Sequence, residues 1–387
     1  MSSESALGLY LHIPFCRHRC AYCDFNTYST VGELTGDYVD ALLEEVREVA
    51  GDSRRPASTV YFGGGTPSLL PAESVRLLVD KVKGSFELDG KAEITLEANP
   101  ETLSLEYLSA VRRAGVNRLS LGAQSANAAE LALLEREHDF ETVVRAVEDA
   151  RAAGFENINL DLIYGLPGQS LASWERSLSA VLVRKPNHLS LYCLTIEPGT
   201  PMNRWLASGR FAAPDPDLAA EQYELASKTL KREGFQHYEI SNWSHPGLAC
   251  QHNLIYWRNG AYLGLGAGAH GHAAGYRYSV VRQPRVYIRR MRSSDPGRFP
   301  WSAALAEKRL LSRSDRMADT IITQLRLLNE GINLDAFNEQ FGLDLFSAYP
   351  GVAEQLIDWG LLQQSAGRLL LSERGQFLSN QVFYRFM

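Results

Sequence analysis

The first half of this 387-residue chain alternates short strand-like runs with helical patterns six times. Runs of apolar residues bounded by turn residues predict buried strands, and apolar residues spaced three and four apart predict helices that cover them. The predicted strands are Leu9–Ile13, Val60–Phe62, Ile94–Glu97, Arg118–Gly122, Ile158–Ile163 and Leu189–Leu194. The predicted helical faces carry Val39, Leu42, Leu43 and Val46, then Val75, Leu78, Val79 and Val82, then Val143, Val144 and Val147. Six βα repeats predict an α/β fold, an open partial (β/α)6 barrel of the TIM type.

Three of the five cysteines lie within eight positions, as Cys16, Cys20 and Cys23, directly after the first predicted strand. This C-x3-C-x2-C spacing brings three thiolates onto one loop and leaves one iron of a [4Fe–4S] cluster free for an outside ligand. A closed zinc site needs four ligands, and no second cysteine pair lies nearby. The odd cysteine count and the lack of a leader-like start argue against a disulfide framework. The spacing therefore predicts an iron–sulfur cluster that works with S-adenosylmethionine (SAM).

Polar residues follow several of the predicted strands. Glu97 ends the third strand, Gln124 follows the fourth, and Asp161 lies within the fifth. In a parallel barrel the ends of the strands meet at one rim, so we expect these side chains to converge on one site. A glycine run, Gly63–Gly65, follows the second strand and leaves room for a ligand to approach main-chain N–H groups. The run does not continue as a phosphate-binding loop.

Composition places the chain among cytoplasmic globular proteins. Hydrophobic residues make up 45% of the chain, charged residues 22%, and the formal net charge is −6. No apolar run approaches the ~18 residues that span a bilayer, and no Lys/Arg block indicates a nucleic-acid tract. We therefore expect no nucleic-acid partner and no transmembrane segment, with any membrane contact peripheral.

The remaining chain is predicted to form two further parts. After the barrel at residues 1–215, residues 216–293 hold a helical arm, Leu218–Arg232, and a Gly- and aromatic-rich extension. Ser294–Pro300 is a predicted linker. Residues 301–387 are expected to form a small α+β domain like a winged helix, with helices at Met317–Leu328, Leu334–Phe341 and Gly351–Trp359 and a hairpin at Leu361–Gln364 and Leu369–Leu371. Acidic residues on its helices argue against DNA binding, so we interpret it as a lid or docking platform. The tail Phe377–Met387 is expected to pack on the barrel or on a partner.

Five motifs together resemble the oxygen-independent coproporphyrinogen III oxidase family of radical SAM proteins. They are Tyr10-Leu-His-Ile-Pro-Phe-Cys16, Gly63-Gly-Gly-Thr-Pro67, Glu97-Ala-Asn-Pro100, Ser120-Leu-Gly-Ala-Gln124 and Asp161-Leu-Ile-Tyr-Gly-Leu-Pro167. The resemblance covers nearly the whole chain. This family contains true oxidases and a sister branch of haem chaperones. The oxidases carry a further cysteine two residues after the third cluster ligand, where this chain has Phe25, and His252-Asn-Leu-Ile-Tyr-Trp257 resembles the H-N-x-x-Y-W segment of the chaperones. The resemblance therefore implies a haem chaperone, with coproporphyrinogen dehydrogenase activity as the alternative.

The resemblance also implies roles for individual residues. Cys16, Cys20 and Cys23 would hold the [4Fe–4S] cluster. The residues implied beside SAM are Tyr10, Tyr22, Gly64, Gly65, Thr66, Glu97, Gln124, Arg136, Asp161, Thr195 and His270. For Arg136 a solvated helix charge is the alternative.

For haem, the candidate iron ligands are His252, then Cys250, His270, His245, His12 and His18. Tyr256 and Trp257 supply flat apolar surface beside His252, and Cys193 is interpreted as a core residue. Haem would be delivered to respiratory haem enzymes at the inner face of the cytoplasmic membrane by transient docking. A binding protein with a merely structural cluster stays an alternative, and the oligomeric state, including a homodimer, is left open.

Overall fold

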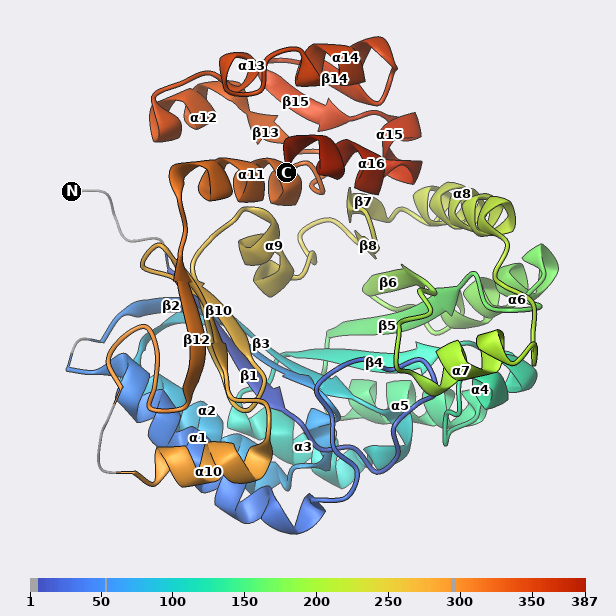
Figure 1. Ribbon diagram of the computed structural model, residues 1–387. Coiled ribbons are helices and arrows are strands. Elements are labelled where there is room, and N and C mark those ends of the chain that lie inside the picture. Colours follow the sequence, from blue (N-terminus) through green and yellow to red (C-terminus); the bar gives the residue numbers. More distant parts are fainter. Residues whose placement is uncertain (1–5, 53, 294–296) are drawn as a thin grey trace.

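A twelve-stranded sheet forms the body of the protein, seen in a computed structural model that describes residues 6–52, 54–293 and 297–387. Its centre is a run of parallel strands in chain order (Figure 1). These are β1 (Leu7–Ile13), β2 (Pro56–Gly64), β3 (Glu87–Ala98), β4 (Arg118–Gln124), β5 (Asn157–Tyr164) and β6 (His188–Cys193). All six predicted strands are confirmed, and so is the open partial barrel that they form. Buried apolar residues alternate along each strand with side chains that point toward the inside of the barrel.

Helices cover the outer face of this sheet (Figure 1). They are α1 (Thr35–Ala50), α2 (Ala72–Ser85), α3 (Leu105–Ala114), α5 (Phe140–Ala152), α6 (Leu171–Leu182) and α8 (Pro216–Arg232). Helices α4 (Ala128–Leu133) and α7 (Pro201–Ala207) lie beside the cysteine loop, where Ala21 forms main-chain hydrogen bonds with Leu134 and Met202. Short 3-10 helices occur at η1 (Gly32–Leu34), η2 (Pro67–Leu69), η3 (Pro100–Thr102) and η4 (Tyr384–Phe386). The predicted apolar faces of α1, α2 and α5 pack into the core, with Leu43 and Val144 only partly buried. Side-chain caps at Ser104, Asp139, Ser170 and Asp215 fix where α3, α5, α6 and α8 begin.

Six further strands extend the sheet at both edges. They are β7 (Gln236–Glu239), β8 (Asn242–Ser244), β9 (Tyr262–Leu265), β10 (His270–Ala273), β11 (Tyr276–Val280) and β12 (Leu305–Leu310). The strand order is β12-β11-β10-β9-β1-β2-β3-β4-β5-β6-β8-β7, in which β9 is parallel to β1 and the outer pairings are antiparallel. Helices α9 (Gln251–Trp257) and α10 (Pro284–Met291) lie between these strands in sequence. The Gly- and aromatic-rich extension is therefore part of the sheet. The domain boundaries at residues 215 and 301 stay predictions, and Ser294–Pro296 of the predicted linker lie outside the described residues.

The C-terminal part forms a small α+β unit with its own core, as predicted. It contains α11 (Arg313–Gln324), α12 (Leu334–Phe341), α13 (Leu345–Ala348), α14 (Val352–Asp358), α15 (Glu373–Phe377) and α16 (Ser379–Phe383), with strands β13 (Ile332–Asn333), β14 (Leu362–Ser365) and β15 (Arg368–Leu371). The expectation that the tail packs on the barrel is largely wrong. Val382, Phe383 and Phe386 are buried in the core of the C-terminal unit itself, because the turn after β15 returns the chain to it. Phe377, at the start of the tail, contacts the body, where its ring packs edge-on against Tyr223 of α8 with 5.3 Å between the centroids.

Helix α11 joins the two edges of the sheet (Figure 1). It follows β12, the first strand in the spatial order, and leads to residues that lie against β7, the last. There the Leu328 N–H donates to the Tyr238 carbonyl at 3.1 Å, and the Asn329 amide donates to the His237 carbonyl at 3.0 Å. One helix thus spans the open side of the partial barrel.

Candidate functional site

The cysteine loop begins where β1 ends and is held by main-chain hydrogen bonds. The Cys16 N–H donates to the Tyr28 carbonyl at 3.1 Å, and the Cys23 N–H donates to the Cys20 carbonyl at 3.1 Å. All three thiols are free and partly exposed. Burial raises the pKa of Cys16 and of Cys23. A bound iron centre supplies the positive charge that favours the thiolate form, so this chemistry fits a metal cluster.

Two polar side chains from other elements point at these sulfur atoms. The Thr66 hydroxyl lies 3.5 Å from Cys16 Sγ, and Arg136 Nη1 lies 3.3 Å from Cys20 Sγ. Hydrogen-bond donors to the sulfurs stabilise thiolate charge and tune a cluster. No group of three His, Cys, Asp or Glu side chains in the described residues is arranged to hold a single metal ion. Ligands of a cluster bind different irons and need not converge on one point.

A cavity of about 430 Å³ opens beside the cysteine loop, inside the partial barrel. It brings together residues from the ends of β2 to β6 and from the loops that follow them. The predicted residues that line it are Cys16, Cys20, Tyr22, Cys23, Gly64, Gly65, Thr66, Glu97, Gln124, Arg136, Asp161 and Thr195. The cavity thus has the cysteine loop at one side and a polar interior.

The carboxyl groups of Glu97 and Asp161, which line the cavity, are held by different partners. Glu97 accepts from the Tyr61 hydroxyl at 2.8 Å and from the Gly64 N–H at 3.1 Å. Asp161 accepts from the Asn159 amide at 2.7 Å and the Ser120 hydroxyl at 3.2 Å. Burial raises the pKa of Glu97 to about 7 and also raises the pKa of Asp161. Both keep acceptor capacity for ligand hydroxyl groups.

The glycine run contributes close packing more than free N–H groups. The Gly64 N–H is bound by Glu97, the Gly65 N–H donates to the Ile13 carbonyl at 2.8 Å, and the Thr66 N–H donates to the Phe15 carbonyl at 2.8 Å. The expectation that these N–H groups are open to a ligand is therefore wrong. Gly64 has a φ of +113°, and a Cβ there would lie 2.5 Å from the His12 ring. These glycines let the cluster loop pack against the end of β2.

Arg136 is held inside the site instead of being a solvated helix charge. It follows α4, and its Nη2 donates to Asn99 Oδ1 at 2.7 Å and to the Gly122 carbonyl at 3.2 Å. With the contact to Cys20, the guanidinium links the cluster loop to β3 and β4. Gln124 ends β4 with a φ of 64°, the left-handed region, which marks a functional or strained position.

Two residues implied beside SAM lie away from the cavity lining. The Tyr10 hydroxyl is 3.1 Å from His12 Nδ1, and its ring stacks on Tyr61 with 6.1 Å between the centroids. His270 is exposed on β10. Their implied roles stay predictions.

The residues predicted for haem cluster on α9, beneath the cavity. His252 is 1% exposed, and its two ring nitrogens lie 2.7 Å from the Thr59 hydroxyl and 2.8 Å from the Tyr256 hydroxyl. Burial lowers the pKa of His252 to about 3. Iron ligation by His252 would require one of these hydrogen bonds to break.

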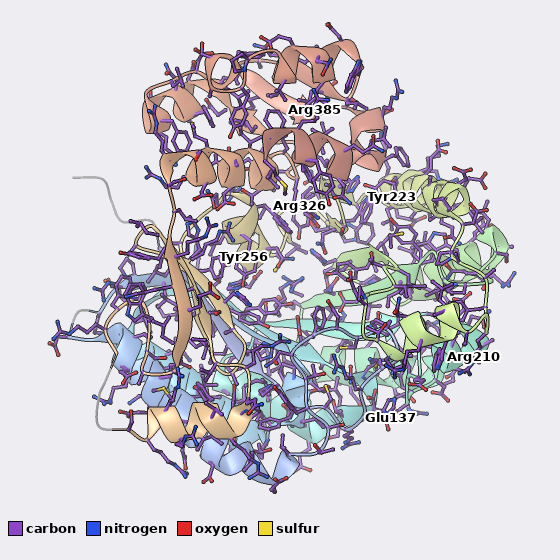
Figure 2. All side chains as sticks on the ribbon, viewed as in Figure 1. Glu137, Arg210, Tyr223, Tyr256, Arg326 and Arg385 are labelled. Atoms are coloured by element: carbon purple, nitrogen blue, oxygen red, sulfur yellow. The ribbon has the colours of Figure 1, made fainter. Side chains whose placement is uncertain are left out.

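Of the residues predicted around His252, Cys250 is enclosed and Trp257 is half-buried. Cys250 is buried 3.4 Å from Glu93, and burial raises its pKa to about 12. Trp257 stacks under Arg326, whose guanidinium carbon lies 4.3 Å from the ring centroid. Figure 2 shows Tyr256 and Arg326 between the sheet and the C-terminal unit. Haem ligation therefore stays a prediction.

The three remaining histidine candidates have ordinary partners. His12 is buried and bonded to Tyr10 and to the Asn26 carbonyl, and His245 stacks on Phe235 with 4.1 Å between the centroids. His18 lies at the surface, 3.5 Å from Glu135.

Several lining residues were missed by the sequence analysis. They are Tyr61, Arg118, Ser120, Asn159, Ser190, Tyr192 and Asn253. Most of them alternate with apolar residues along β4, β5 and β6, so a period-two pattern of polar residues was the available signal. Cys193 was interpreted as a core residue, and this is wrong. It ends β6 at the rim, where it is exposed and lines the cavity.

Comparison with known proteins agrees with this geometry. Residues 10–181 match the family model of the Radical SAM superfamily, and residues 311–378 match that of the HemN C-terminal domain. The protein named Heme chaperone HemW in Bacillus subtilis (strain 168) is 36% identical over 383 residues, which cover 98% of either chain. The chain belongs to the HemW family. Its relative of that name in Escherichia coli (strain K12) is 35% identical over 391 residues, again covering 98% of either chain.

A solved structure supports the fold of this HemW family member. Coproporphyrinogen III oxidase (HemN) from Escherichia coli, described as a radical SAM enzyme, is 25% identical. The match has a TM-score of 0.83 and covers 99% of this chain and 90% of that one. The resemblance inferred from the motifs is therefore confirmed. Membership of the radical SAM superfamily implies a [4Fe–4S] cluster and SAM. No helix in the described part of the chain has the length and apolar character needed to cross a bilayer.

Proposed function

We propose that this chain is a haem chaperone, which binds haem and delivers it to respiratory haem enzymes. The observation that carries the proposal is its likeness, over nearly its whole length, to relatives named Heme chaperone HemW. A cytoplasmic location with transient contact at the inner membrane face belongs to the same proposal. The alternative is an oxygen-independent coproporphyrinogen III oxidase, and the likeness to the HemN structure supports this alternative.

Phe25 favours the chaperone over the oxidase. Its side chain lines the cavity and is 63% exposed, two residues beyond Cys23. In the oxidases, the resemblance places a further cysteine at this point. A phenyl ring can neither donate a proton nor form a thiolate, so position 25 supplies no such group. It offers a flat apolar surface instead.

The cavity residues fit the [4Fe–4S] cluster and SAM. Cys16, Cys20 and Cys23 would hold three irons, with Thr66 and Arg136 as donors to the sulfurs. When bound together, the cluster and SAM supply one-electron chemistry. The carboxyl groups of Glu97 and Asp161 line the same cavity and would accept from ligand hydroxyl groups. Tyr22, Gln124 and Thr195 complete the proposed lining.

Haem binding is proposed to involve α9 and its surroundings. His252 is the first candidate ligand, with Cys250, Tyr256 and Trp257 around it. Because both His252 nitrogens already have partners, ligation by this residue is coupled to local rearrangement. A chaperone must release its cargo, and the free-energy cost of breaking one of these hydrogen bonds keeps the dissociation rate of haem high.

Two assays on one preparation test the proposed function. The protein is reconstituted with iron and sulfide under anaerobic conditions, and haem is titrated while the Soret band is recorded. Decarboxylation of coproporphyrinogen III is then measured with SAM and a reductant. We expect a haem-dependent Soret shift and no turnover. Turnover at a useful rate would establish the oxidase, and absence of both signals would leave a binding protein with a structural cluster.

A ligand substitution tests the haem site. His252→Ala is compared with His237→Ala, which is not a candidate ligand and whose ring stacks on Trp243 with 3.9 Å between the centroids. We expect the first to change the haem spectrum and weaken binding, while the second leaves both unchanged. Identical spectra and stoichiometry in the two variants would remove His252 as a ligand.

Haem delivery and membrane contact need their own measurements. Transfer of haem to an apo respiratory haem enzyme should be faster from the loaded protein than from free haem. Co-flotation with vesicles of bacterial lipid should be weak and reversible. Lack of transfer would contradict delivery, and stable flotation would contradict transient contact.

A further inference from the structure

Arg118 is a buried cation that has no hydrogen-bond partner among the described residues. It begins β4 inside the barrel and is 2% exposed, and its Nε is completely enclosed. The nearest carboxylate oxygen belongs to Glu93, at 4.0 Å from Nε. A guanidinium offers five donors, and burying one without acceptors is strongly unfavourable. The Arg118 guanidinium therefore has no close acceptor for its N–H groups.

Glu93 forms only a long ion pair with Arg118, because its carboxylate is held by other donors. Its carboxylate accepts from the Gln251 N–H at 3.0 Å, from the His252 N–H at 3.1 Å and from Cys250 Sγ at 3.4 Å. These groups belong to the start of α9, so Glu93 fixes that helix to the barrel. Glu97 and Asp161 are likewise bound to Tyr61 and to Asn159, respectively.

Arg118 lines the cavity together with a second unused polar group. Asn253 of α9 lines it as well, and its amide makes no hydrogen bond with the described residues. Thr95, which is paired with Arg118 across the β3–β4 ladder, has a buried hydroxyl without a partner. Two buried polar groups, from β3 and β4, thus lack a partner, and the half-buried Asn253 of α9 reaches the same cavity.

Arg118 lies at the end of the cavity that is far from the cysteine loop. Arg118 and Gln124 are the two ends of β4, and six residues of strand correspond to ~20 Å. Gln124 lies at the end beside the cysteine loop, whereas Glu97 and Asp161 lie beside Ser120, between the two ends.

We infer that the inner end of the cavity is a subsite for a carboxylate group of a ligand, with Arg118 as its cationic anchor and Asn253 as a second donor. A guanidinium fork matches the two oxygens of a carboxylate. The acidic side chains of Glu97 and Asp161 line the same cavity, so a singly charged carboxylate fits better than a doubly charged phosphate. Two sources are compatible with this chemistry, the propionate of a tetrapyrrole and the amino-acid end of SAM. The tetrapyrrole source rests on the proposed function.

Paired ligands that differ only in the carboxylate test the subsite. The reconstituted protein is titrated with haem and with haem dimethyl ester, and separately with SAM and with decarboxylated SAM. Each dissociation constant is measured for the wild type, for Arg118→Gln and for the exposed control Arg76→Gln. For one pair we expect the wild type to prefer the free acid by about tenfold or more, since hydrogen bonds to charged groups have that strength. Arg118→Gln should reduce this preference to about twofold or less, and Arg76→Gln should preserve it.

The ligand pair whose preference for the free acid falls in Arg118→Gln identifies the source of the carboxylate. If Arg118 only supports the fold, Arg118→Gln lowers stability while both acid preferences stay as in the wild type, and the subsite is refuted. If Arg118→Gln does not fold, Arg118→Lys is measured in its place. Lysine keeps the positive charge but cannot bind both carboxylate oxygens through two parallel N–H groups. If both preferences for the free acid are unchanged in Arg118→Lys, the subsite is refuted as well. Wild-type protein that binds no haem contradicts the proposed function instead, and the SAM pair then decides the subsite alone.

Discussion

Glu45 allows a quantitative prediction because it is a fully enclosed carboxyl group with three donors. It lies on α1, is 1% exposed, and accepts from the Gly266 N–H at 2.6 Å, the Tyr287 hydroxyl at 2.7 Å and the Ser302 hydroxyl at 2.6 Å. Burial raises its pKa from 4.5 to about 7, against the opposing effect of the three donors. The folded protein therefore holds this proton more tightly than the unfolded chain does.

The raised pKa fixes the sign of the pH dependence. Between pH 4.5 and about 7 the folded state binds more protons at Glu45, so the free energy of unfolding falls as the pH rises. Each pKa unit corresponds to ~1.4 kcal/mol, which makes the total loss about 3 kcal/mol. Glu45→Gln has similar volume and cannot titrate, so it should lack this part of the slope.

Urea denaturation at several pH values from 4.5 to 8 measures the effect. The difference in unfolding free energy between wild type and Glu45→Gln should shift by about 3 kcal/mol across this range. Glu141→Gln, an exposed control on α5, should follow the wild type. The part of the difference in unfolding free energy that does not change with pH comes from the altered hydrogen bonds. The part that changes with pH comes from the proton on Glu45. Parallel curves for wild type and Glu45→Gln would refute the reasoning.

Two further predictions concern the cluster loop. Arg136→Gln removes a charged donor to Cys20, so iron should be lost to a chelator about tenfold faster than from the wild type, and equal rates would contradict the role of the guanidinium. Gly64→Ala places a Cβ 2.5 Å from His12 at a φ of +113°, and should destabilise the protein by about 2 kcal/mol or more in urea. Gly154→Ala, at a φ of +89° with nothing within 4 Å, is the matched control. Similar losses in the two alanine variants would show that the contact with His12 is not the cause.

The parallel strands could be predicted from the sequence because each is buried on a helix-covered face and is followed by an amphipathic helix. Strands β7 to β11 have only three to five residues and lie among glycines and aromatic residues, and they join the sheet through the pairing of β8 with β6 and of β9 with β1, which are distant in sequence. Their pairing depends on the sheet that β1 and β6 already provide. No local pattern contains that information.

The candidate site shows the same division. The cysteine spacing and the strand-end positions of Glu97 and Asp161 were visible because they depend on neighbours in sequence. The environment of His252 was not, since its hydrogen-bond partner Thr59 lies 193 residues away along the chain. Arg118 was hidden for a related reason, because its lack of acceptors is a property of the folded interior.

Helix α11 also sets a fixed width for the molecule. Its 12 residues span ~18 Å as a rigid rod, and its two ends are tied to opposite margins of the sheet. The margins can separate only if the helix bends or the contacts with β7 break, which include the hydrogen bonds from Leu328 and Asn329. The curvature of the sheet, which shapes the interior, therefore depends on the position of α11 in the small C-terminal unit. Substitutions far from the cavity, in the packing of α11, can alter its shape.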